Sequence, residues 1–256
     1  IASDGDVITV SLTADEAITG VSVSIAGQSA AVEGSGVTYS GAYTVVEADV
    51  AGGAASIAID FEDMASNAGT TVTSTTDPSA VVIDLVAPTL TEVSIVSSNA
   101  NDDTLANGGD TITLTLAADE DILQPVVRLA GEVASVSGSG SSYTAEYTVD
   151  AADLSAFDGS AVTFSVAFVD LAGNEGVAVD AVTDSSAVTI DLTAPTLTSV
   201  TIASDNSADT SRANAGDTIT LSIVASEDIV SPTVTIAGSS ATVASTSASV
   251  YSATYS

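Results

Sequence analysis

Acidic and amide side chains recur at three kinds of place in this sequence, and their types suit one chemistry. An Asp lies in a stretch that occurs twice, Ile-Asp-Leu-x-Ala-Pro-Thr, at 83–89 and 190–196. A run of three acids occupies 119–121, and Asp170 and Asn174 enclose a Leu-Ala-Gly turn. Ca²⁺ takes about six to eight carboxylate, amide or backbone oxygens with loose geometry. These residues predict a divalent cation site wherever the fold brings them together.

The same acids do not form a recognisable catalytic set. Carboxylate pairs such as Asp102 and Asp103 could exchange protons with a substrate, but they lie in loops that recur along the chain. The chain has no His, no Cys and no Lys that could complete a general acid and base pair. We therefore expect a protein that is not an enzyme.

Charge limits the partners of the chain. There are 34 Asp and Glu against two basic residues, Arg128 and Arg212, and the formal net charge is −32. Such a polyanion is repelled by nucleic acid and by anionic membranes, so neither is expected as a partner, whereas divalent cations are. Hydrophobic residues reach 45%, which distinguishes the chain from a disordered acidic tail.

The elements that must position these acids belong to a repeat. Pro88 and Pro195 of the recurring stretch are 107 residues apart (195 − 88). Each joint lacks a Gly/Ser spacer, so neighbouring units should be coupled stiffly. We expect three units: 1–84, without its first strand; 85–191, complete; and 192–256, without its C-terminal part.

The complete unit has the pattern of a β-sandwich. Residues 111–116 alternate Thr with Ile or Leu, and in 162–168 the residues Val162, Phe164, Val166 and Phe168 should share the core face. Short strands are predicted, with turns between them, at 89–97, 111–116, 125–130, 132–136, 143–149, 162–168 and 181–191. About seven short strands in a unit of this size predict an all-β fold of tandem immunoglobulin-like sandwiches arranged end to end.

Four segments together resemble a known family. They are Gly-Asp-Thr-Ile-Thr-Leu at 109–114, the acidic turn at 119–121, Asp-x-Ala-Gly-Asn at 170–174 and Ile-Asp-Leu-Thr-Ala-Pro-Thr at 190–196. In this order they resemble the bacterial immunoglobulin-like (Big-type) repeats of large extracellular adhesin-like surface proteins. The resemblance covers essentially the whole chain, and implies an exported array of sandwiches that often carries calcium at its joints. Met64 and Ser66 depart from the turn pattern in the first unit.

In an immunoglobulin-like sandwich, the turn after the second strand and the turn before the last strand lie at the same pole, where the chain enters the unit. We expect the acidic turn 119–121, the turn 170–174 and the preceding Asp84 to meet there. Carboxylates brought that close would repel one another, and a divalent cation would turn the repulsion into binding. We therefore expect Ca²⁺ at the joints. The candidate ligands are Asp84, Glu120, Asp170 and Asn174 at the first joint, Asp191 and Glu227 at the second, and Glu16, Asp63 and Asn67 in the first unit.

These residues also have structural explanations that involve no ligand. Asp and Asn commonly cap exposed turns without any ion. The loop 99–110, which recurs at 206–217, could be a second cation site, but it lacks EF-hand spacing and turn chemistry explains it better. The six tyrosines occur as one pair in each unit, which indicates core packing more than ligand recognition.

The sequence as a whole predicts a structural spacer, the stalk of an exported, cell-surface protein. The alternative is a subunit of an extracellular filament, sheath or surface layer, in which identical chains would be partners beside the neighbouring repeats. A sugar- or protein-binding module would need a loop insertion or an aromatic platform that only one unit carries, and none is present.

Overall fold

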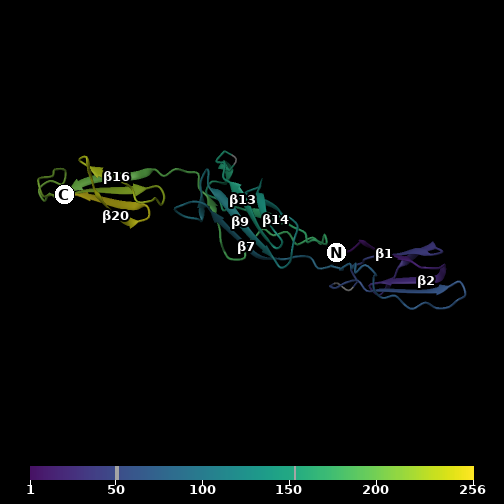
Figure 1. Ribbon diagram of the computed structural model, residues 1–256. Coiled ribbons are helices and arrows are strands. Elements are labelled where there is room, and N and C mark those ends of the chain that lie inside the picture. Colours follow the sequence, from purple (N-terminus) through teal and green to yellow (C-terminus); the bar gives the residue numbers. More distant parts are fainter. Residues whose placement is uncertain (50–51, 153) are drawn as a thin grey trace.

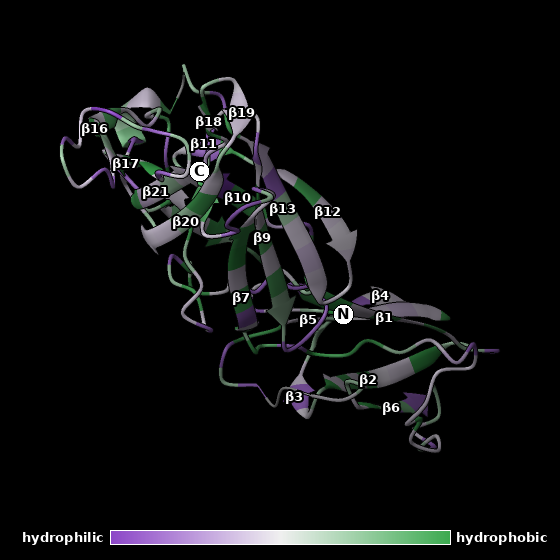
Figure 2. Ribbon diagram, turned by 90° about the vertical axis from the view of Figure 1, so that its left-hand side faces the viewer, coloured by the Kyte–Doolittle hydropathy of each residue, from purple (hydrophilic) through white to green (hydrophobic). Residues whose placement is uncertain are grey.

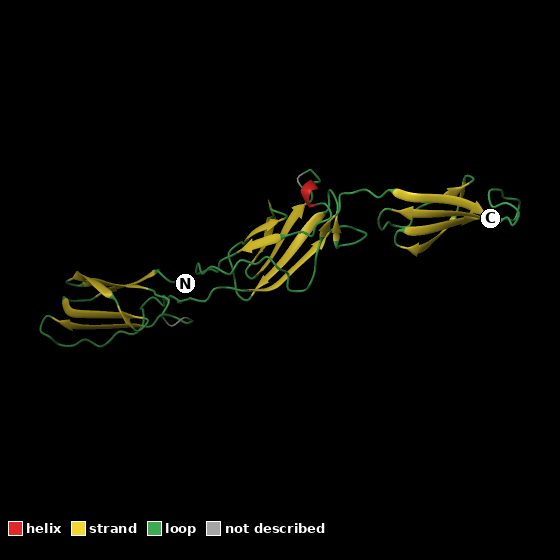
Figure 3. Cartoon of the chain, turned by 180° about the vertical axis from the view of Figure 1, so that it is seen from behind, coloured by secondary structure: helices red, strands yellow, loops and turns green. Residues whose placement is uncertain are grey.

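The computed structural model describes residues 1–49, 52–152 and 154–256, and places three β-rich units end to end (Figures 1 and 3). Three separate clusters of buried apolar side chains form the cores, one in each unit. The described parts of the chain contain no helix with the length and apolarity that crossing a membrane requires. The expected all-β fold of tandem immunoglobulin-like sandwiches is confirmed.

The central unit consists of two packed sheets. One sheet has the order β12-β13-β9-β7 and the other the order β11-β10-β14, while a short parallel pair, β15-β8, closes the end of the unit. The strands are β7 (Leu90–Ser97), β8 (Leu105–Ala106), β9 (Thr111–Ala118), β10 (Val126–Leu129), β11 (Glu132–Val133), β12 (Ser135–Ser139), β13 (Ser142–Thr148), β14 (Phe164–Ala167) and β15 (Thr189–Ile190).

Alternation along the strands builds the core between these sheets. In β9 the side chains of Ile112, Leu114 and Leu116 are buried, whereas the threonines between them are half-buried on the outer face. The alternation is visible along β7 and β9 in Figure 2. Val166 and Phe168 are buried, and Val162 and Phe164 pack against the same cluster, so the core face predicted for 162–168 is confirmed.

The first unit repeats this architecture with one difference. Its sheets have the orders β1-β5-β4 and β3-β2-β6. Among the described strands, β1 therefore pairs only with β5, whereas its counterpart β9 pairs with both β13 and β7. The strands are β1 (Val7–Thr13), β2 (Ile18–Ile25), β3 (Gln28–Ser29), β4 (Ala31–Ser35), β5 (Thr38–Thr44) and β6 (Ile57–Asp63).

The third unit has a four-stranded sheet of order β16-β17-β21-β20 and a small pair, β18-β19. Its strands are β16 (Leu197–Ser204), β17 (Ile219–Ala225), β18 (Thr235–Ile236), β19 (Ser239–Ser240), β20 (Thr242–Ser247) and β21 (Val250–Tyr255). β16 corresponds to β7, and both strands shift register at their start, against β17 and β9 respectively.

The strand predicted over 181–191 is wrong for most of its length, because only Thr189 and Ile190 form a strand. In the rest of the segment, side-chain hydroxyls and one backbone bond to β7, from the Thr183 N–H to the Val93 carbonyl, stand in place of a continuous ladder. Thr183 Oγ1 accepts a hydrogen bond from the Val93 N–H at 3.0 Å, and Ser186 Oγ accepts one from the Ile95 N–H at 2.8 Å. Two further elements were not predicted, the short strand β8 and one 3₁₀ turn, η1 (Ser155–Phe157).

Candidate cation site at the joint of units one and two

A buried tyrosine positions the acidic turn 119–121. The Tyr143 hydroxyl on β13 donates a hydrogen bond of 2.9 Å to the carbonyl oxygen of Ile122. Tyr39 makes the same bond to Ile18 at 2.8 Å, and Tyr251 to Ile229 at 2.6 Å. The packing role predicted for the tyrosines is confirmed for Tyr143, which is buried in the core. The same residue also fixes the turn that carries Glu120.

The second turn of the site is held by the carboxylate of Asp170. Its Oδ1 accepts hydrogen bonds from the N–H groups of Ala172, Gly173 and Asn174 at 2.7, 2.7 and 2.9 Å. Its side chain is 0% exposed. A β-bridge between Ile122 and Asp170 places this turn directly beside the acidic one. Two turns remote in sequence thus form one rigid platform at the pole where the chain enters unit two.

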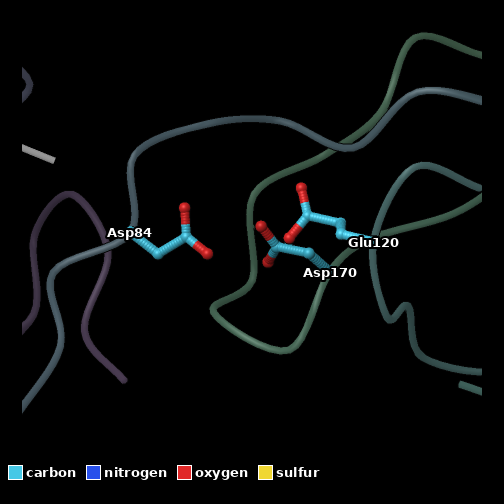
Figure 4. A group of neighbouring side chains, drawn as sticks. All are labelled: Asp84, Glu120 and Asp170. Atoms are coloured by element: carbon cyan, nitrogen blue, oxygen red, sulfur yellow. The ribbon is translucent and has the colours of Figure 1, made fainter. Parts of the chain in front are cut away.

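Three carboxylates meet at this pole. Asp84 at the end of unit one and Glu120 and Asp170 in unit two each offer an oxygen, and these oxygens all lie within 4.8 Å of one another. Figure 4 shows the Asp84 carboxylate facing the other two from the opposite side of the joint. Asp84 and Glu120 are half-buried. The structure therefore brings together three of the four ligands predicted for the first joint.

Asn174, the fourth predicted ligand, acts here as a donor and bridges the two units. Its Nδ2 donates to Asp170 Oδ2 at 2.7 Å and reaches the carbonyl oxygens of Asp84 at 3.1 Å and of Val86 at 3.4 Å. The last two carbonyls belong to the linker, so the joint holds backbone oxygens beside the three carboxylates. Sequence patterns did not reveal these two carbonyls.

The carboxylates repel one another. The pKa of Glu120 is raised above its ordinary value, first by burial and then by the negative charges of Asp84, Asp170, Asp119 and Asp121. Burial of an acid among other acids disfavours its charged form. A bound cation would reverse this effect.

Asp119 plays a different part, since it anchors the linker. Its Oδ1 accepts a hydrogen bond from the Thr89 N–H and its Oδ2 one from the Thr89 hydroxyl, both at 2.8 Å. These bonds favour the charged carboxylate and lower the pKa of Asp119. Leu85, just before the anchored segment, packs against the core of unit one. The linker is therefore fastened on both sides.

Both residues predicted at the second joint lie in one pocket. Asp191 and Glu227 line a common pocket of about 430 Å³, together with Asn99, Asn107 and Asp228. Within the described ranges the three-carboxylate arrangement occurs only at the first joint. Glu227 Oε1 is buried and has no hydrogen-bond partner among the described residues.

The second joint has a fastening that sequence reasoning missed. Asp158 Oδ1 accepts from the Leu192 N–H at 2.7 Å, and its Oδ2 from the Thr193 hydroxyl at 2.5 Å. No repeated motif marked Asp158, because the aligned position of the first unit is Ala51.

In unit one, the predicted residues form half of the arrangement. Asp63 accepts hydrogen bonds from the N–H groups of Ala65 and Asn67, both at 2.8 Å, and from Asn67 Nδ2 at 2.7 Å. Ser66 adopts the left-handed conformation, with φ 68°, that Gly173 adopts in unit two. Glu16 is exposed. Ala2 bridges to Ile83 beside the joint, and β1 runs from there to Thr13. The turn that carries Glu16, and Asp63, which pairs with Ile18, therefore lie at the pole of unit one away from unit two.

The loop 99–110 is explained by its own hydrogen bonds. Asn99 Nδ2 donates to Asp110 Oδ2 at 3.0 Å, and Asn206 repeats the bond to Asp217 at 2.9 Å. The Asp110 and Asp217 carboxylates also accept from the backbone N–H groups of Asn107 and Asn214. This is the turn chemistry expected of Asn and Asp.

No protein-family model and no curated protein matches the chain. Among solved structures, the I9-I11 tandem of titin is 8% identical, with 99% of this chain and 84% of that chain covered and a TM-score of 0.38. Fibronectin(III)-like modules of Clostridium thermocellum CbhA are 14% identical over 75% and 88%, with a TM-score of 0.31. The Bacteroides ovatus glucan-utilisation protein SGBP-B, solved with a mixed-linkage heptasaccharide, is 14% identical over 79% and 46%, with a TM-score of 0.18. These neighbours carry no argument about function.

Proposed function

We propose that the chain is a stiff, non-enzymatic spacer of an exported surface protein, and that Ca²⁺ stiffens the joint between units one and two. The observation that carries this proposal is the distribution of the three carboxylates across the joint. Asp84 belongs to one unit, and Glu120 and Asp170 belong to the next. A cation bound by all three carboxylates would hold the two units in one relative orientation, because any other orientation would break its contacts with Asp84 or with Glu120 and Asp170.

The donor set fits calcium in type and in spacing. Ligand oxygens about 2.3–2.6 Å from a Ca²⁺ ion are at most roughly 4.6–5.2 Å from one another. The three carboxylate oxygens, all within 4.8 Å, meet this limit. The Asp84 and Val86 carbonyls lie beside them. Half a turn of the Asn174 amide would present its oxygen in place of its nitrogen.

Thermal unfolding and small-angle scattering, each in Ca²⁺ and in EDTA, test the proposal. A site filled at a hundred times its dissociation constant stabilises the fold by about 2.7 kcal/mol. We expect Ca²⁺ to raise the unfolding midpoint and to narrow the distribution of end-to-end lengths. An unchanged midpoint together with unchanged scattering would refute it.

Asp84→Asn is the variant of choice, because it removes a charge at the joint without removing a core side chain. Asp103→Asn is the matched control, since Asp103 is exposed in a loop of unit two outside the cluster. We expect the first substitution to abolish the calcium response and the second to preserve it. Equal responses in both variants would contradict the assignment of Asp84.

The second candidate function is a subunit of an extracellular assembly of identical chains. It is favoured by the edge strand β12 of the complete central unit, which pairs only with β13 among the described strands, because an uncovered strand edge offers unpaired N–H and C=O groups to another chain.

A further inference from the structure

Asn107 and Gly108 form the one Asn-Gly pair in the sequence. Both residues are exposed in the turn that follows β8. The Gly108 N–H donates no hydrogen bond to any residue that the structure describes. The side-chain amide carbon of an Asn is open to attack by the backbone nitrogen of the next residue, and a Gly there places no side chain in the way. The pair therefore meets the chemical conditions for deamidation.

Unit three contains the same turn with a different second residue. Asn214 is followed by Ala215 where Asn107 is followed by Gly108. The backbone N–H of each Asn donates to the Asp carboxylate three residues further on, at 2.9 Å in unit two and 2.7 Å in unit three. The N–H of that Asp returns to the Asn carbonyl oxygen at 3.1 Å in both units. The two turns thus share their hydrogen bonds and differ in the residue whose nitrogen would attack.

Asp-Gly pairs undergo a related cyclisation, and the sequence has two of them, at 4–5 and 158–159. In the structure their glycine nitrogens are engaged. The first donates its N–H to the Val45 carbonyl oxygen at 2.9 Å, and the second to the Ile190 carbonyl oxygen at 2.8 Å. Such a bond must open before the nitrogen can attack, and opening costs free energy. Gly108 carries no such restraint within the described ranges.

From these contrasts we infer that Asn107 is a site of spontaneous deamidation. The Gly108 nitrogen attacks Cγ of Asn107, and the new C–N bond closes a succinimide ring. The bond from Cγ to the side-chain nitrogen breaks, and this nitrogen leaves as ammonia with the proton that Gly108 loses. Water then opens either C–N bond of the ring, which gives aspartate or isoaspartate at position 107. The reaction consumes water and needs no enzyme, metal or oxidant.

The modification changes the chain beside the second joint. Isoaspartate carries the main chain through Cβ and Cγ, which lengthens the backbone directly after Ala106. Ala106 pairs with Ile190 on β15, and its carbonyl oxygen accepts a hydrogen bond from the Asp191 N–H at 2.9 Å. Both products also add a carboxylate to a turn that already contains the Asp110 carboxylate. We therefore expect conversion to lower the unfolding midpoint of unit two. No cation takes part, so this inference stands apart from the proposed function.

Peptide mapping by mass spectrometry, after incubation of the full chain in heavy-oxygen water, tests the site. We expect residue 107 to take up the label several-fold faster than Asn214, and more rapidly as the pH is raised, because the attacking nitrogen must lose its proton. Asp158 should stay unlabelled over the same period. Equal rates at the two asparagines would overturn the inference. So would an Asn107 that stays intact while a free peptide of residues 104–111 converts.

Asn107→Ser and Gly108→Ala block the reaction by different means. Ser3 occupies the same place in unit one and donates its N–H to the Asp6 carboxylate at 2.9 Å, so the first variant keeps the turn. The second reproduces the residue of unit three, and its Cβ would lie 3.2 Å from Ala151 Cβ, which requires a small shift. On incubation the wild type should lose thermal midpoint in step with its isoaspartate content, while both variants keep theirs. An equal loss in all three proteins would show that conversion at 107 does not weaken the unit.

Discussion

The surroundings of Glu120 disfavour its charged carboxylate in the metal-free joint, whereas a bound cation would favour it. Without a cation its negative charge is disfavoured by burial and by Asp84 and Asp170, which raise its pKa. With a cation the same charge becomes a ligand. A single substitution should therefore change sign in its effect on stability when the cation is added.

We predict that Glu120→Gln raises the unfolding midpoint in EDTA at neutral pH and lowers it in saturating Ca²⁺. Differential scanning calorimetry in both conditions measures this, with Glu146→Gln on the exposed face of β13 as control. A change of about 1 kcal/mol in the free energy of unfolding of one unit moves its thermal midpoint by roughly 4–8 °C. The same sign in both conditions would show that Glu120 does not bind the ion.

The pH dependence follows from the same residue. Because the folded-state pKa of Glu120 is raised, its contribution to stability is fully present below the ordinary Glu pKa and is lost as pH rises through the folded-state value. We predict that, in EDTA, Glu120→Gln gains stability relative to the wild type as the pH is raised from the acid side toward neutrality. A difference between the two proteins that is independent of pH would rule this out.

Tyr143 is the second residue whose loss should be measurable. Tyr143→Phe removes the hydrogen bond to the Ile122 carbonyl and leaves that acceptor unsatisfied. We predict a loss of about 1 kcal/mol in the stability of unit two, together with weaker calcium binding because the acidic turn is released. Titration calorimetry separates the two effects, with Tyr251→Phe in unit three as a control that changes stability only.

For the secondary-structure elements, the alternation of polar and apolar residues was the sequence signal that best predicted the strands. The Thr and Ile or Leu pattern of 111–116 identified β9 and its buried face, since only a half-buried strand requires a period of two. The segment 181–191 was misread because its Thr and Ser residues supply hydroxyls that pair with β7 in place of a ladder. The strand β8 was missed because two residues carry no periodicity.

The same reasoning limits how much of the site could be foreseen. Repetition and chain order were enough to gather Asp84, Glu120 and Asp170, because the strands of a sandwich bring their turns to fixed poles. The contacts of Asn174 with the Asp84 and Val86 carbonyls depend on how one unit is oriented on the next. The residue pattern of a single repeat does not determine that orientation, so these contacts could not be predicted from it.

In units one and two, a glycine packs closely against an aromatic ring of the core, and this contact leads to a prediction about packing in unit two. A Cβ atom at Gly176 would lie 2.2 Å from Phe168 Cε2, and at Gly69 it would lie 2.3 Å from Phe61 Cε2. We predict that Gly176→Ala displaces Phe168 from the core and destabilises unit two by about 1–3 kcal/mol. Urea unfolding measures the loss. An unchanged midpoint would show that the ring moves aside without cost.

For the whole molecule, the joints determine the shape. The first joint is fastened by Asn174 and by the Asp119–Thr89 pair, the second by Asp158. Between these fastenings no flexible spacer is present. Under the proposed function, we expect the three units to behave as one extended body rather than to move independently.

We predict that Asn174→Ala broadens the interdomain motion seen by scattering or by NMR relaxation, because it removes the side chain that reaches from unit two to the linker. Asn67→Ala is a matched control, since Asn67 makes the same bond to Asp63 at the pole of unit one away from the joint. It should leave the motion unchanged. Equal broadening in both variants would show that Asn174 does not couple the units.

The parallel pair of β8 with β15 has a mechanical consequence. The chain enters unit two along β7, just before β8, and leaves it just after β15. Tension applied to the two ends of the chain would slide these parallel segments past each other, so that their hydrogen bonds are loaded together in shear rather than opened one by one. If the chain is the spacer proposed above, we expect this sandwich to stay folded under load.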